Sequence, residues 1–190
     1  MNRLIVGYTT AAIYAASKAE TPEYTRFELR LVPLAQPLSK RYPALTAATL
    51  DQYHSIARQG HSFGAFVEGT CIGLALNEVH PWNASLWVQE FHIAAAYQGQ
   101  GIGRLIMERV IQHAQEQGLR CIVCETQTTN VPAISFYRAL GFALEGIDLS
   151  YYTNQDLEHQ EIAIFLKKKL NSADQAHENM SIAQHLEILP

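Results

Sequence analysis

At Gln98-Gly99-Gln100-Gly101-Ile102-Gly103 the chain passes from an apolar segment, residues 86–93, to an amphipathic segment that continues to about Gln117. We interpret the first as a strand and the second as a helix. Glycines at such a junction let backbone N–H groups and the positive end of the helix dipole converge on one point, which suits phosphate or pyrophosphate. The stretch therefore predicts a phosphate-binding loop, with an ordinary glycine-rich turn as the alternative.

Two common nucleotide-binding motifs do not fit this loop. No Lys-Ser or Lys-Thr follows the glycines, and their spacing departs from the dinucleotide-binding fingerprint. The ligand therefore has to be identified from other parts of the chain.

The composition predicts a soluble globular protein. With 190 residues and 48% hydrophobic content, we expect one domain over residues 1–170 and a polar tail over 171–190, with a short helix near 182–188. The formal net charge of −4 argues against nucleic acid or an anionic membrane as a general partner. The first 20 residues contain one Arg and several interrupting polar residues, so we expect no signal peptide and a cytoplasmic location.

The cysteines and histidines show no metal-site or disulfide pattern. Cys121 and Cys124 lie three apart in a predicted strand, where their side chains point to opposite faces, so buried thiols are expected. The eight histidines are scattered. We therefore predict no metal.

Hydrophobic periodicity and turn residues predict the order of the elements. Helices are expected at 44–58, from the glycine loop to about 117, and at 130–141, where Asn130 caps the first turn and Gly141 ends the helix. The predicted strands cover residues 27–34, 62–68, 71–79, 86–93, 119–125, 142–150 and 161–168. A hairpin run followed by strand and helix alternation predicts an α+β or α/β fold, with a mixed, mostly antiparallel central sheet flanked by helices.

Two motifs in this order resemble the GNAT N-acetyltransferase superfamily. The first is Gln98-x-x-Gly101-x-Gly103 after a strand, and the second is Asn130-x-x-Ala133-x-x-Phe136-Tyr137 with Gly141-Phe142. The resemblance covers residues 63–166, implies the GNAT-like acyl-CoA N-acyltransferase fold with a cofactor core at about 63–168, and makes acetyl-CoA the expected cosubstrate. Dimers are common among such folds, so a homodimer is left open.

A narrower likeness is to the streptothricin acetyltransferase branch. It rests on Glu125-Thr126-Gln127, Asp148, Tyr151-Tyr152 and the run Glu161 to Phe165. That branch has an acidic neighbourhood on the strand before the loop, whereas Gln89-Glu90 supplies a single carboxylate here. The resemblance implies N-acetylation of a small-molecule amine, such as a streptothricin-like antibiotic, which would confer resistance.

The resemblance also implies which residues bind the cofactor. Backbone N–H groups of the loop would receive the pyrophosphate, the end of the preceding strand would pair with the pantetheine amides, and the helix that Asn130 caps would face the pantetheine arm. The implied cofactor-binding residues are Phe91, His92, Ile93, Gln98, Gly99, Gln100, Gly101, Ile102, Gly103, Arg104, Asn130, Ala133, Phe136 and Tyr137.

Direct attack by the amine in a ternary complex needs a base, an acid and a donor for the carbonyl oxygen. The resemblance makes Tyr137 the general acid, while its helical spacing also fits a core tyrosine. Glu90, a carboxylate in an otherwise apolar strand, is the candidate base, with a surface-facing or salt-bridged Glu on the polar side of the strand as the alternative and His92 or Glu125 as other candidates. The oxyanion donor is expected among the backbone N–H groups near His92 and Ile93.

The resemblance implies an acceptor pocket after the second helix, around Asp148, Tyr151 and Tyr152. A carboxylate beside aromatic faces would suit a cationic amine there. A strand edge packed on the core is the alternative for these residues. Two other functions stay open at this point. One is a protein N-terminal or lysine acetyltransferase, and the other is a non-catalytic acyl-CoA-binding sensor.

Overall fold

The computed structural model describes residues 4–170 and 187–189. They form two compact units, the first made of residues up to 6, 43–124 and 168 onward, the second of residues 7–42 and 125–167. The predicted single domain over 1–170 thus stays a prediction. Among the described residues, no helix is long and apolar enough to cross a membrane.

The first unit contains a mixed sheet with the hydrogen-bonded order β6-β5-β4-β3-β9. Its strands are β3 (Phe63–Val67), β4 (Thr70–His80), β5 (Ser85–Ile93), the first four residues of β6 (Cys121–Gln127), and β9 (Glu187–Leu189). Neighbouring strands are antiparallel except β5 and β6, which are parallel. This arrangement confirms the predicted mixed, mostly antiparallel sheet.

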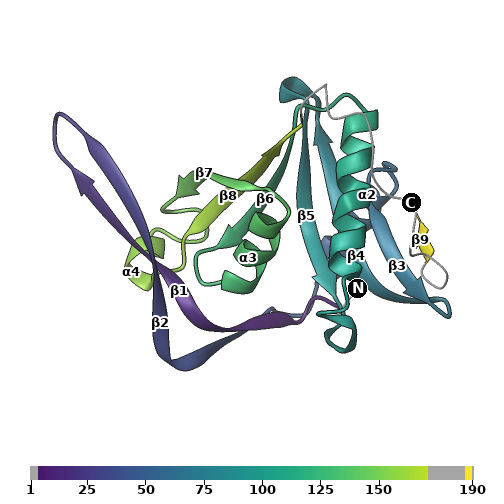
Figure 1. The fold of residues 1–190 in the computed structure, drawn as a ribbon, viewed down its shortest axis with the longest axis horizontal. Coiled ribbons are helices and arrows are strands. Elements are labelled where there is room, and N and C mark those ends of the chain that lie inside the picture. The colour runs from purple at the N-terminus through teal and green to yellow at the C-terminus, as the bar shows by residue number, and fades with distance from the viewer. Residues whose placement is uncertain (1–3, 171–186, 190) are drawn as a thin grey trace. The chain divides into compact units, whose positions relative to one another are not determined.

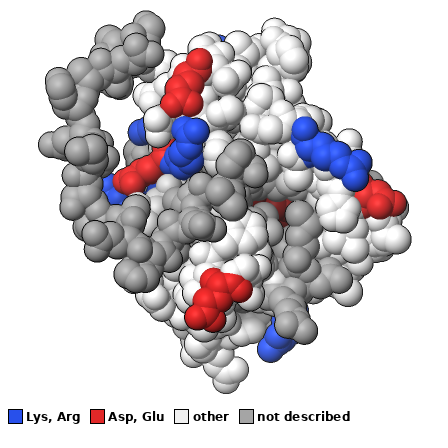
Figure 2. All heavy atoms as spheres, turned by 90° about the vertical axis from the view of Figure 1, so that its right-hand side faces the viewer, with Lys and Arg blue, Asp and Glu red and all other residues white. Residues whose placement is uncertain are grey.

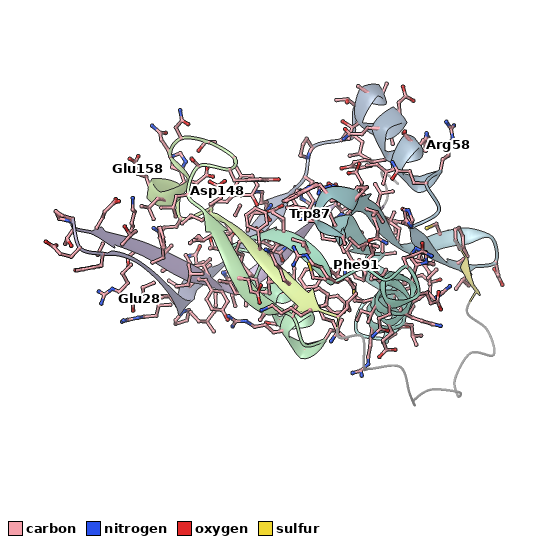
Figure 3. All side chains as sticks on the ribbon, turned by 90° about the horizontal axis from the view of Figure 1, so that it is seen from above. Glu28, Arg58, Trp87, Phe91, Asp148 and Glu158 are labelled. Atoms are coloured by element: carbon pink, nitrogen blue, oxygen red, sulfur yellow. The ribbon has the colours of Figure 1, made fainter. Side chains whose placement is uncertain are left out.

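Helices α1 (Ala47–Ala57) and α2 (Ile102–Glu116) cover the two faces of β4 (Figure 3). On one face, Ile56 of α1 packs with Leu74 and Leu76. On the other, α2 approaches so closely that a Cβ on Gly73 would lie 3.0 Å from Cδ1 of Ile106. Because side chains alternate along a strand, this single strand connects both halves of the core.

The second unit begins with a long hairpin of β1 (Gly7–Glu20) and β2 (Thr25–Arg41) (Figure 1). The predicted strand at 27–34 was too short, since β2 continues past Pro33 and Pro37. Four residues, 34–37, lie opposite Ala11 between the pairs Ala12↔Pro33 and Thr10↔Leu38. This bulge removes Pro37 from the ladder, and β2 is an edge strand, where a residue without an N–H is tolerated.

The rest of the second unit contains α3 (Val131–Ala139), β7 (Ala143–Asp148), α4 (Asp156–His159) and most of β8 (Ala163–Lys169). The side chain of Asn130 caps α3, as predicted, by accepting a hydrogen bond from the N–H of Ala133 at 3.2 Å. Strands β7 and β8 are antiparallel. The short helix α4 was not predicted.

Two further predictions concern buried thiols and the C-terminal tail. Cys121 and Cys124 are buried, as expected. The predicted helix near 182–188 is wrong at its end, because Glu187–Leu189 form strand β9, which pairs with β3. The rest of the predicted polar tail, residues 171–186 and 190, lies outside the described residues.

Candidate functional site

The predicted phosphate-binding loop connects β5, the 3₁₀ turn Ala95–Tyr97 and α2. Gly99 and Gly101 have φ angles of +74° and +83°, which side chains with a Cβ rarely adopt. Helix α2 begins after Gly101 without a side-chain cap. Its first N–H groups therefore have no intrahelical acceptor and point toward the loop side of the helix.

Two glutamine side chains brace this loop. Gln98 Nε2 donates to the carbonyl oxygen of Ile93 at 3.0 Å, and Gln100 Nε2 donates to that of Ala96 at 2.9 Å. Arg104 is held by its own helix, where its Nε lies 2.7 Å from Glu108 Oε1. The side chains of Gln98 and Gln100 thus hold the backbone of the loop, and its N–H groups are the ones predicted to bind an anion.

The loop fits the pyrophosphate of a coenzyme A group. A Cβ added to Gly99 or Gly101 would meet no atom within 4 Å, so the space before the backbone is open. Residues 98–104 also contain no carboxylate that would repel an anion. An uncapped helix start, open space and the absence of acidic side chains are the features that an anion site at a helix N-terminus needs.

Strand β5 leads into the loop and contains a bulge. Leu76 pairs with Glu90 and Asn77 with Val88, so Gln89 is an extra residue on β5. The ladder to β6 runs from Ser85/Cys121 to Val88/Cys124, and Phe91, His92 and Ile93 lie past its last pair. Phe91 and Trp87 can be located on this strand in Figure 3. A bulge changes the direction of the side chains that follow it, and here it precedes Glu90.

Glu90 is the centre of a hydrogen-bonded cluster. The Tyr53 hydroxyl, from α1, donates to Glu90 Oε1, and His92 Nε2 lies 2.6 Å from Glu90 Oε2. The side chains of Glu90 and His92 are 21% and 15% exposed, so Glu90 is not surface-facing. Its contact with His92 fits the salt-bridged form of the alternative as well as the role of a base. Burial, reinforced by the hydrogen bond to Glu90, raises the pKa of Tyr53 well above its ordinary value.

Tyr53 is a residue that the sequence analysis missed. The predicted helix at 44–58 contained it, but no spacing connects position 53 to position 90. A tyrosine on the strand-facing side of an amphipathic helix is the signal that was available, and core packing explains such a residue equally well.

Tyr137 and its neighbours lie in the second unit. Tyr137 is 5% exposed, and its ring centroid lies 5.4 Å from that of Phe136 and 5.5 Å from that of Phe142. The α3 face that holds Tyr137 also buries Ile134, with Ala133 half-buried. This packing is compatible with the core-tyrosine alternative and with the general-acid role.

A second polar cluster in this unit joins residues from β2, β6 and the loop after β7. The Tyr152 hydroxyl donates to Glu125 Oε1, and Lys40 Nζ forms an ion pair with Glu161 Oε1. Lys40 Nζ also lies 6.0 Å from the Tyr152 ring centroid. Burial raises the pKa of Tyr152, and the Glu125 charge raises it further. Burial also lowers the pKa of Lys40, against the effect of Glu125.

Asp156 positions the loop that holds Tyr152. Its carboxylate accepts hydrogen bonds from the N–H of Tyr152 at 2.8 Å and from the N–H and hydroxyl of Thr153, both at 2.7 Å. Burial would raise the pKa of Asp156, but these hydrogen bonds outweigh it and hold the pKa below its ordinary value. Asp148, predicted in the same pocket, accepts from the N–H of Ser150 at 2.9 Å.

No metal centre is found among the described residues, which contain no group of three or more His, Cys, Asp or Glu side chains placed as ligands. On the face in Figure 2, the charged side chains of these residues stand in small groups of both signs. The described residues that are visible in this view form no extended basic patch of the kind typical of nucleic-acid-binding proteins.

Sequence comparison matches residues 20–142 to the family described as Acetyltransferase (GNAT) family. A curated relative, the streptothricin acetyltransferase of Streptomyces lavendulae, is 32% identical over 137 residues, which are 70% of this chain and 72% of that protein.

Structure comparison gives a consistent result. The crystal structure of a nourseothricin acetyltransferase, 28% identical, superposes with a TM-score of 0.66 and covers 88% of this chain and 89% of that one. A Bacillus anthracis protein crystallised in complex with acetyl coenzyme A superposes with a TM-score of 0.67 over 88% of this chain and 90% of that one, at 21% identity. The second likeness concerns the fold alone.

Proposed function

This chain belongs to the acetyltransferase (GNAT) family, and we propose that it transfers the acetyl group of acetyl-CoA to a primary amine of a small molecule. The observation that carries the proposal is the glycine loop, whose open, uncapped helix start fits a pyrophosphate. Acetyl transfer is the activity of the family. The finer part of the proposal is that the acceptor is an amine of a small molecule.

In the proposed complex, the cofactor is bound chiefly through backbone groups. N–H groups of residues 98–104 receive the pyrophosphate, with Gln98 and Gln100 keeping the loop in place. The backbone of Phe91, His92 and Ile93 pairs with the pantetheine amides as an added strand would. Asn130, Ala133, Phe136 and Tyr137 of the second motif face the pantetheine arm.

The acceptor amine must lose a proton before it attacks, because an alkylamine with a pKa of about 10 is mostly protonated at neutral pH. Glu90 takes this proton, directly or through a water molecule, and Tyr53 and His92 hold its carboxylate in one orientation. A carboxylate fixed on both oxygens has lost its rotational freedom before the substrate arrives, which lowers the cost of reaching the reactive geometry.

Attack forms the N–C bond, and collapse of the tetrahedral intermediate breaks the C–S bond. A backbone N–H near His92 or Ile93 stabilises the negative charge on the carbonyl oxygen. Tyr137 donates a proton to the departing thiolate, so the products are an amide and coenzyme A thiol. No covalent intermediate on the enzyme is needed.

For the acceptor we propose a cationic amine of the streptothricin type. The cluster around Tyr152 supports this class, since it contains the carboxylates of Glu125 and Glu161 beside an aromatic ring that already lies near one ammonium group, that of Lys40. The named activity of the Streptomyces lavendulae relative supports the same class.

A panel of acceptors tests the proposal. Thiol release from acetyl-CoA is followed with streptothricin, aminoglycosides, polyamines and peptides, and mass spectrometry identifies each product. Selective acetylation of streptothricin is the expected result. Turnover confined to peptides would replace the small-molecule acceptor by a protein, and tight acetyl-CoA binding without thiol release across the panel would favour a sensor.

A further inference from the structure

The β1–β2 hairpin has one edge bound to its own unit and one edge that is not. On the β1 side, the N–H of Tyr14 donates to the carbonyl of Thr128 at 3.0 Å, and Gln160 exchanges hydrogen bonds with both backbone groups of Ala16. On the other side, β1 is the one strand partner of β2 within the part of the chain that the structure describes. Figure 1 shows the two strands as a long twisted hairpin. The outer edge of β2 is therefore available for another strand.

The first eight residues of this edge form a regular strand, in which charged and apolar side chains alternate. Pro33 and the bulge after it block pairing further along, but residues 25–32 are regular and contain no proline. Phe27 and Leu31 are 45% and 52% exposed and share one face with Leu29, because side chains two apart point the same way. Exposed apolar residues along an open edge are typical of a surface that binds a further strand.

The sequence of this segment is complementary to itself. If a second copy of β2 pairs antiparallel about a two-fold axis through Leu29, residue i lies opposite residue 58 − i of the other copy. Phe27 then faces Leu31, and Glu28 faces Arg30, at both ends of the pair. The side chains of Glu28 and Arg30 are 43% and 76% exposed and form an ion pair with each other at 2.6 Å, which the pairs across the two strands would extend. Glu28 is labelled on the hairpin in Figure 3. If the two-fold axis passed through position 28, Glu28 would face Glu28 of the other copy, and if it passed through position 30, Arg30 would face Arg30. Like charges directly opposite each other destabilise a strand pair, so these two registers are disfavoured.

We propose that the chain forms a two-fold homodimer through antiparallel pairing of β2 residues 25–32, with Leu29 on the axis. Main-chain hydrogen bonds supply the association, and the three apolar and two charged cross-strand pairs select the register. This inference rests on the hairpin alone and does not depend on the proposed acetyl transfer.

Disulfide trapping tests the register directly. Cys71 is replaced by Ala first, because it is partly exposed while Cys121 and Cys124 are buried. In this background, Leu29→Cys places two thiols opposite each other across the axis, within the distance that a disulfide spans. Mild oxidation should give a covalent dimer on a non-reducing gel. The matched variant Leu31→Cys faces Phe27 of the other copy and should stay monomeric on the gel. Equal trapping of both variants, or trapping of Leu31→Cys alone, would overturn the proposed register.

Charge reversal tests the interface in solution. Sedimentation of the full chain between about 1 and 100 μM should show a monomer–dimer equilibrium. Glu28→Arg places Arg opposite Arg30 twice and should weaken the association by about tenfold or more, while Glu28→Arg combined with Arg30→Glu should restore it. A monomer at every concentration, or a dimer that the single reversal leaves unchanged, would overturn the proposal.

Discussion

The hydroxyl of Tyr53 donates a hydrogen bond to Glu90 Oε1, which connects the middle of α1 to the bulged part of β5. His92 lies 2.6 Å from the other oxygen of the same carboxylate. Because burial raises the pKa of Tyr53, its phenol stays protonated through neutral pH and remains a donor. Glu90 is therefore oriented by two side chains before any substrate binds.

Tyr53→Phe should lower kcat by about tenfold, because it removes the donor to one oxygen of Glu90 and leaves the ring packing intact. The KM for acetyl-CoA should stay unchanged, since Tyr53 acts through Glu90 and not through the cofactor. Steady-state kinetics at saturating acetyl-CoA give both values. Tyr24→Phe, at an exposed tyrosine of the hairpin, is the matched control and should behave as the wild type. A rise in KM for acetyl-CoA with unchanged kcat would contradict the positioning role.

Gly101→Ala should raise the KM for acetyl-CoA by about tenfold or more. The added methyl group would occupy the open space where the pyrophosphate is expected, and alanine is also strained at a φ of +83°. Gly118→Ala separates the two effects, since Gly118 has a φ of +66°, equally open surroundings, and a place at the other end of α2. Both variants should lose about 1 kcal/mol of unfolding free energy, but only the first should bind acetyl-CoA more weakly. An equal loss of binding in both would assign the effect to backbone strain.

Tyr137→Phe should reduce kcat by roughly ten- to a thousandfold while acetyl-CoA binds nearly as well as before, if the phenol protonates the departing thiolate. Calorimetric titration with acetyl-CoA and stopped-flow thiol release measure the two quantities separately. Because the ring is buried against Phe136 and Phe142, phenylalanine keeps the packing. An unchanged rate would return Tyr137 to the core-tyrosine alternative.

Tyr152→Phe should raise the KM for a cationic acceptor by about three- to tenfold and leave the KM for acetyl-CoA unchanged. The variant removes the hydroxyl that holds Glu125 and keeps the aromatic face near Lys40. Tyr151→Phe, at the neighbouring and more exposed ring, should have the smaller effect. Initial rates over a range of streptothricin concentrations distinguish these variants. Equal KM values for the acceptor in both would argue against a recognition role for the Glu125 contact.

The central elements could be predicted because each has a local sequence signal. The glycine loop and Gly118 mark the two ends of α2, and Asn130 marks the start of α3. The positive φ angles at Gly99, Gly101 and Gly118 show why glycine is needed at those positions. Capping and turn residues determine the backbone conformation of only a few neighbouring positions, so they can be recognised in a single sequence.

Relationships between distant residues could not be predicted. Tyr53 and Glu90 are 37 positions apart, and neither helix periodicity nor strand alternation relates one to the other. Strand β1 was missed because alanines and small polar residues occupy much of it, so that its strand character depends on pairing with β2. Pro33 and Pro37 suggested that the strand ends there, but Pro37 lies in a bulge outside the ladder and β2 continues after it.

The most direct measurement is the initial rate of thiol release from acetyl-CoA with streptothricin for the wild-type chain and for Glu90→Gln, with mass spectrometry of the product. We expect monoacetylated streptothricin from the wild type and a rate at least about a hundredfold lower for Glu90→Gln at neutral pH, where most of the amine carries a proton. The difference between the two rates should narrow as the pH approaches the pKa of the amine, because free amine is then present without a base. A Glu90→Gln rate equal to that of the wild type at neutral pH would contradict the assignment of Glu90 as the base that prepares the amine.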